Sequence, residues 1–195
     1  MQGLKDEAVM LEYQKGDTEA MDELLNRYKN PIYAFAFRLS RDATEAQDIT
    51  QEVFLRVHQY RQSYVACGSF RTWIFSIAHN LCVSRFRKAK WLASWPKKNT
   101  DCDEPKEFRS PDPSPKDIAA GNELAVVLKQ CIQGLPFLQR EALILREYEN
   151  LDYQEIARIL KKSIGTVKTL IYRARQNLKN ALLPYLQEVK GGYDV

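Results

Sequence analysis

A twenty-residue stretch near the middle of this 195-residue chain limits what the whole chain can fold into. Five of the eight prolines fall within it: Pro96, Pro105, Pro111, Pro113 and Pro115. A proline-rich, acidic stretch without apolar periodicity cannot bury a face and is typical of a flexible linker. We therefore expect two domains, residues 1–92 and 118–190, joined by an acidic linker over 93–117.

Both flanking parts carry apolar residues at helical spacing, and the alternation typical of strands is nowhere sustained. The predicted fold class is all-α, with two small helical domains on a flexible linker. Pro31, Gly68, Pro136 and Gly165 lie between periodic apolar segments, so we expect them to separate helices.

Several classes of protein are excluded by composition. The longest apolar run has six residues, Ile32 to Phe37, whereas a membrane-spanning helix needs about 20. Acidic residues stand where a signal peptide would carry positive charge, so we expect a cytoplasmic protein with free cysteines. No nucleotide-binding loop, catalytic motif or metal-ligand cluster occurs in the sequence, which predicts no enzyme activity, cofactor, metal or small-molecule substrate.

Charge is distributed in blocks along the chain. Residues 1–60 have a net charge of −4 and residues 61–98 a net charge of +8, with no acidic residue in the second block. Residues 99–123 return to −4, and residues 124–195 carry +4. A solvated surface of no special function would mix the signs, so two basic zones indicate a polyanionic partner.

The C-terminal part predicts a DNA-binding helix-turn-helix. Asp152 and Glu155 form a capping box before a short helix, and Ser163 can cap a second helix after a break. The region from Ile156 to Gln187 has seven basic residues and no acidic one. A basic second helix of this kind fits the major groove, although a basic αα-hairpin with a solvated face has the same spacing. The residues predicted to contact DNA are Ser163, Thr166, Lys168, Thr169, Tyr172, Arg173, Arg175 and Lys179.

The N-terminal part contains two further candidate surfaces. A helix over about 44–60 presents acidic and apolar side chains opposite its buried stripe, which indicates either a solvated face or a protein-docking face. Its outward residues are Asp48, Gln51, Glu52 and Leu55. A loop over 61–69 and a helix from Phe70 interleave aromatic rings with cations, a pattern suited to single-stranded nucleic acid, although most of these rings are also candidate core residues. The candidates are Tyr64, Phe70, Arg71, Trp73, Asn80, Arg85, Arg87 and Lys88.

Taken in order around the linker, three runs resemble the extracytoplasmic-function (ECF) group of the sigma-70 family of transcription initiation factors. They are Glu45 to Leu55, Phe70 to Leu81, and Leu151 to Arg175. The resemblance implies polymerase docking by the first run, reading and melting of the −10 element by the second, and reading of the −35 element by the third. Lys161-Lys162 departs from the small or apolar residues common in the family at this point.

The partners implied by the resemblance are core RNA polymerase, through its β′ coiled coil and β flap, and promoter DNA. Members of the family are often held inactive by an anti-sigma factor, frequently a membrane-anchored one. The competing interpretation is a stand-alone helix-turn-helix regulator with an N-terminal sensing domain. It predicts tight duplex binding without polymerase, and it leaves the acidic face and the basic aromatic helix unexplained.

Overall fold

The computed structural model describes residues 3–93 and 123–191, and all the regular structure in these residues is helical. This confirms the all-α class and the two helical domains. The linker predicted over 93–117 lies, from residue 94 onward, outside the described residues.

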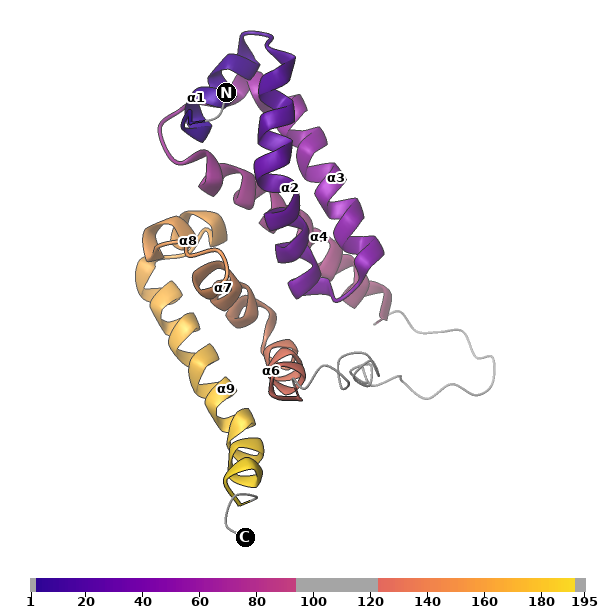
Figure 1. Cartoon of the computed structure of the whole chain (residues 1–195), viewed down its shortest axis with the longest axis vertical. Helices are drawn as coiled ribbons and strands as arrows, with labels where there is room; N and C mark the ends of the chain where they lie inside the picture. Colours follow the sequence, from indigo (N-terminus) through magenta and orange to yellow (C-terminus); the bar gives the residue numbers. More distant parts are fainter. Residues whose placement is uncertain (1–2, 94–122, 192–195) are drawn as a thin grey trace, which may run out of the picture.

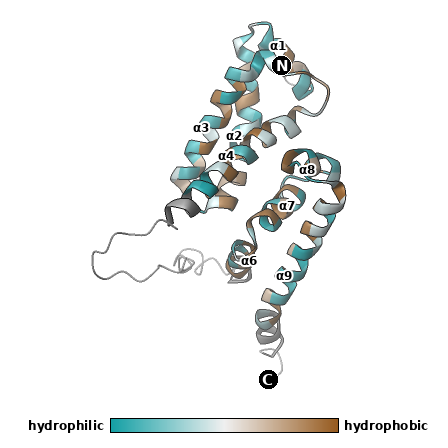
Figure 2. Cartoon of the chain, turned by 180° about the vertical axis from the view of Figure 1, so that it is seen from behind, coloured by the Kyte–Doolittle hydropathy of each residue, from teal (hydrophilic) through white to brown (hydrophobic). Residues whose placement is uncertain are grey.

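The first domain is a helical bundle (Figure 1). Its elements are α1 (Asp6–Gln14), α2 (Thr18–Ser40), α3 (Ala43–Tyr60), the 3₁₀ turn η1 (Arg61–Ser63) and α4 (Phe70–Ala93). Asp17 and Asp42 cap α2 and α3, because each carboxylate accepts a backbone N–H of the first turn. Figure 2 shows hydrophobic and hydrophilic residues mixed along each helix, as expected when one face is buried.

Two expectations for this domain are wrong. Pro31 lies inside α2 and does not separate two helices. Tyr60 continues the apolar spacing of the helix predicted over about 44–60 and is therefore expected in its buried stripe, but it is the last residue of α3 and is 48% exposed. The remaining buried residues of that stripe are as expected.

The second domain contains the predicted helix-turn-helix. Its elements are α6 (Glu123–Gln133), α7 (Phe137–Glu147), α8 (Tyr153–Leu160) and α9 (Ile164–Gly191). Gly165 lies inside α9, so this glycine does not separate helices either. Leu143 of α7, together with Ala174 and Leu178 of α9, belongs to a small apolar core of this domain.

The two domains contact each other. Helix α8 packs against α4, and α7 packs against α2 (Figure 1). One cluster of buried apolar side chains runs through both domains, including Ile74 and Phe75 of α4 and Ile156 and Ile159 of α8. In the part of the chain that the structure describes, no helix has the length and apolarity to cross a membrane.

Candidate nucleic-acid interface

The turn between α8 and α9 is defined by local hydrogen bonds. Asp152 accepts the Glu155 backbone N–H at 2.7 Å, and the Glu155 carboxylate accepts the Asp152 N–H at 2.9 Å, which is the predicted capping box. Lys161 ends α8 in the left-handed region, with a φ of 53°. The Ser163 hydroxyl then accepts the Thr166 N–H at 3.1 Å and begins α9, as predicted.

The outer face of α9 is open to solvent. Val167 and Ile171 face the core, whereas Tyr172 on the other side is 64% exposed. All eight residues predicted to contact duplex DNA are exposed: Ser163, Thr166, Lys168, Thr169, Tyr172, Arg173, Arg175 and Lys179. The helix therefore presents cations and hydrogen-bonding groups together on a surface that can enter a major groove.

Two of these cations also have partners within the domain. Arg175 donates to Glu147 at 2.5 Å, and this hydrogen bond raises the pKa of the guanidinium. Lys168 lies 6.0 Å from the centre of the Tyr153 ring. Both contacts lie at the surface, so neither keeps the cation from an approaching phosphate.

The aromatic residues ahead of and at the start of α4 form a packed cluster. The Tyr64 ring lies 5.8 Å from Phe70 and 5.0 Å from Trp73, measured between ring centres. Tyr64 and Phe70 are buried and Trp73 is half-buried, and burial raises the pKa of Tyr64 to about 12. In this arrangement the first two rings support the loop rather than offer a stacking surface.

The polar candidates on α4 lie in different surroundings. Asn80, Arg87 and Lys88 are exposed, and Arg85 lies 3.9 Å from Asp48 of α3. Arg71 is drawn instead toward the second domain, where its guanidinium lies 3.3 Å from Glu149.

The outer face of α3 carries the four predicted docking residues. Asp48 and Gln51 are exposed, and Leu55 is 57% exposed beside them. Glu52 pairs with Arg56 one turn later, at 2.9 Å. An exposed leucine among carboxylates, on a rigid helix, is an arrangement suited to a protein partner.

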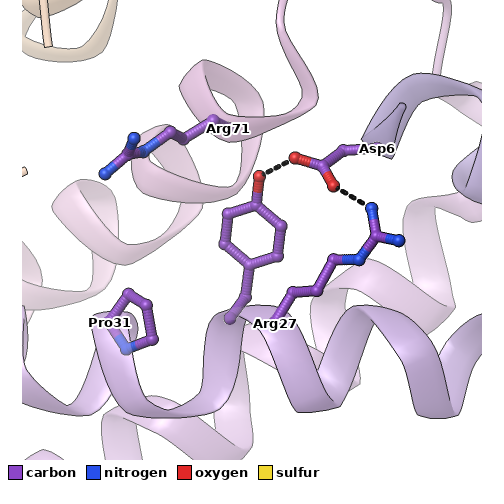
Figure 3. A pocket seen from close by; sticks show the side chains of 5 residues that line it. Asp6, Arg27, Pro31 and Arg71 are labelled. Atoms are coloured by element: carbon purple, nitrogen blue, oxygen red, sulfur yellow. Dashed lines mark hydrogen bonds and ion pairs between the residues drawn. The ribbon is translucent and has the colours of Figure 1, made fainter. Parts of the chain in front are cut away.

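A pocket of about 280 Å³ opens next to the start of α4 (Figure 3). Asp6 of α1 holds two neighbours on α2, with its carboxylate 2.6 Å from Arg27 and hydrogen-bonded to the Tyr28 hydroxyl. Pro31 and Arg71 complete the lining. This pocket could not be predicted from the sequence, because residues so far apart in the chain give no common local signal.

Metal binding has no candidate in the described residues, where no three or more His, Cys, Asp and Glu side chains gather closely enough to hold an ion. The three cysteines in the described residues, Cys67, Cys82 and Cys131, are free thiols.

Comparison with known proteins matches both domains to one family. Residues 24–92 match sigma-70 region 2, and residues 125–178 match sigma-70 region 4. The two domains of the fold thus correspond to two regions of the sigma-70 family, and neither of these two matches is to an enzyme family.

Relatives that match along most of the chain show to which group of sigma-70 factors it belongs. The chain is 33% identical over 193 residues to the RNA polymerase sigma-H factor of Pseudomonas aeruginosa, covering 94% of this chain and 97% of that protein. It is 32% identical over 171 residues to the ECF RNA polymerase sigma factor SigW of Bacillus subtilis, covering 86% and 91%. The chain belongs to the ECF group of the sigma-70 family.

Solved structures share the fold. The structure of CnrH in complex with the cytosolic domain of CnrY has a TM-score of 0.68 at 23% identity, covering 92% of this chain and 97% of CnrH. The sigma factor RpoE in complex with the anti-sigma factor NepR, from Bartonella quintana, has a TM-score of 0.63 at 24% identity, covering 83% and 95%.

Proposed function

We propose that this protein binds core RNA polymerase in the cytoplasm and directs it to promoters with −35 and −10 elements, without making or breaking a bond itself. The observation that carries the proposal is the exposed outer face of α9, where polar and cationic side chains gather on the second helix of a helix-turn-helix. Family membership supplies the polymerase as partner.

Each surface makes a different contact with the promoter or the polymerase. Lys168, Thr169, Tyr172 and Arg173 read base edges of the −35 element, while Arg175 and Lys179 contact phosphates. Asn80 of α4, with the loop ahead of Phe70, captures an extruded base of the −10 element. A pocket that receives such a base offsets part of the energy of unstacking it.

The acidic face of α3 docks on the polymerase. Its exposed carboxylate and apolar side chains suit a basic, partly apolar partner surface, such as the β′ coiled coil of the polymerase. Family membership likewise suggests that the second domain binds the β flap of the polymerase. Two structural neighbours are described as bound to anti-sigma factors or to a partner's cytosolic domain, and we extend regulation by such a partner to this chain.

The test is transcription in vitro with sigma-free core polymerase and a pool of genomic fragments. We expect discrete start sites that require the protein and that weaken at least tenfold with Asp48→Ala/Glu52→Ala. The matched control is Glu19→Ala/Asp22→Ala, which removes two carboxylates from α2 and keeps full activity. Specific duplex binding by the protein alone, with no start-site selection, would instead establish a stand-alone regulator.

A further inference from the structure

Helix α1 lies outside the part of the chain that matches sigma-70 region 2, because that match begins at residue 24. The helix nevertheless packs against η1, which begins the loop over 61–69, and against α4, which follows this loop. The proposed function assigns the loop to capture of an extruded base. The contacts that hold the loop in place therefore concern promoter melting.

Gln14, at the end of α1, holds the beginning of the loop. Its side-chain amide donates to two backbone carbonyls, Arg61 O at 2.5 Å and Tyr64 O at 2.7 Å. In return, the Gln62 side chain donates to the Gln14 carbonyl at 3.1 Å. The Tyr64 hydroxyl is buried with no hydrogen-bond partner in the described residues, so the polar contacts of this residue are made by its backbone.

Glu7, two turns earlier on α1, holds the end of the loop. Its carboxylate accepts the Phe70 backbone N–H at 2.9 Å. That N–H belongs to the first turn of α4, where the helix itself supplies no acceptor, and a carboxylate also suits the positive end of the helix dipole. Glu7 and Gln14 are seven residues apart and lie on the same side of α1. One face of α1 therefore holds both ends of the loop.

Helix α1 is itself fixed to two other helices of the domain. The Asp6 carboxylate accepts hydrogen bonds from Arg27 and Tyr28 of α2 (Figure 3). Near the other end of α1, the Tyr13 hydroxyl lies 2.5 Å from His58 Nδ1 of α3. The loop thus rests on a helix that is joined to the rest of the bundle at both ends.

Between its two held ends the loop is open to solvent. Tyr64 and Phe70 are buried, whereas residues 65–68 are exposed, and Val65 is 69% exposed. A loop with fixed ends and an exposed middle can present its groups to a ligand without first being ordered. Such a preformed site binds more tightly than a mobile one, because less conformational entropy is lost on binding.

We propose that Glu7 and Gln14 are positioning residues for capture of the −10 base, which act by holding the two ends of the loop over 61–69. The inference rests on the proposed function for the identity of the ligand, and on the contacts above for the positioning. Asn80 and the loop contact the base, whereas the two α1 side chains determine how well the loop is placed to receive it.

The first test measures the ends of the loop in the free protein, by NMR hydrogen exchange. The reporters are the Tyr64 and Trp73 amides, which donate to backbone carbonyls of the loop and not to either α1 side chain. Gln14→Met removes the donor without changing the charge, and we expect the Tyr64 amide to exchange at least about fivefold faster. Glu7→Ala should have this effect on the Trp73 amide. Glu7→Gln retains an accepting oxygen and should exchange nearly as slowly as wild type.

Glu12→Ala is the matched control on α1. The Glu12 carboxylate pairs with Lys15 at the surface, so both reporter amides should exchange as in wild type. Wild-type rates in Gln14→Met and Glu7→Ala would overturn the positioning. Equal acceleration across the amides of α2 and α3 would also overturn it, because that result is the mark of general destabilisation.

The second test measures base capture by the holoenzyme. The probes are two fluorescein-labelled single strands carrying the −10 element mapped by transcription. One is intact, and the other is abasic at the position where an abasic site weakens wild-type binding most. We expect wild type to prefer the intact strand by about tenfold or more, and Gln14→Met and Glu7→Ala to prefer it by about threefold or less. Glu7→Gln has the same charge as Glu7→Ala but should keep the wild-type preference.

The ratio of the two affinities separates positioning from a general structural effect. A variant that is only less stable loses affinity for both strands alike and keeps the wild-type ratio, and that result would overturn the proposal. If the wild-type holoenzyme binds the two strands equally, base capture itself is wrong. Because the exchange test uses no DNA, failure of the positioning and failure of the proposed function give different results.

Discussion

At the scale of single residues, the outer face of α9 separates side chains that can read bases from those that can only meet phosphates. Arg173 lies one residue after the exposed Tyr172, on the same face as Lys168 and Thr169 near the start of the helix. Lys179 is exposed almost two turns later. The N-terminal residues of a recognition helix reach base edges, whereas residues further along meet the backbone.

We predict different effects of two alanine substitutions on promoter binding by the holoenzyme. Arg173→Ala should weaken binding about tenfold to a hundredfold on the preferred −35 element and much less on a mutated element. Lys179→Ala should weaken binding equally on both and lower the slope of log affinity against log salt by about 1. Filter binding over a salt series measures both, and equal losses for Arg173→Ala on the two elements would contradict base reading.

At the scale of elements, the capping box determines where α8 begins. Asp152 and Glu155 each satisfy a backbone N–H that the first turn of a helix otherwise leaves free. We predict that Asp152→Ala destabilises the start of α8 by about 1 kcal/mol, which should speed amide hydrogen exchange there about fivefold. Asp152→Ser retains a capping oxygen and should exchange nearly as slowly as wild type. Equal rates for the two variants would show that the cap does not hold this turn.

The same element shows why parts of the fold could be predicted from the sequence. A capping box, an apolar stripe and a Ser163 cap are signals within about a dozen residues, so the helix-turn-helix was predictable. Pro31 was misleading because a helix with a well-buried face tolerates the loss of one hydrogen bond. The exposed basic residues on α9 were also predictable, because the helical spacing that identifies its buried stripe places them on the opposite face.

The contacts of α4 were not predictable in this way. The partners of Thr72, His79 and Phe86 lie more than 50 residues away, beyond the linker, and no local pattern links the two faces. His79 in particular looks like an ordinary polar surface residue in the sequence. Only the packing of α7 against the first domain gives it a buried carboxylate.

At the scale of the whole molecule, the packing of the second domain against the first buries groups that titrate. Burial raises the pKa of Glu141, an effect that the hydrogen bond from His79 and the nearby charge of Arg140 only partly oppose. Burial also raises the pKa of Glu149, opposed by Arg71, and that of the neighbouring Cys82 thiol, which stays protonated. The folded protein therefore holds protons at these groups up to a higher pH than the unfolded chain does.

The sign of the pH dependence follows from these raised values. A carboxyl group whose pKa is higher in the folded protein than in the unfolded chain stabilises the fold at low pH, and this contribution is lost as the pH rises through the raised value. Raising the pH through the raised pKa of Glu141 should therefore lower the free energy of unfolding.

We predict that the free energy of unfolding falls as the pH rises through the raised pKa of Glu141, by up to about 1.4 kcal/mol per pH unit for one proton. Glu141→Gln keeps a hydrogen bond to His79 without a titrating carboxyl, so its stability should depend less on pH over the same range. Urea denaturation at constant ionic strength measures both proteins. A wild-type stability that does not fall above the ordinary pKa of a glutamate would mean that the fold does not hold a proton at Glu141, whereas an equally steep fall in Glu141→Gln would assign the proton to another group.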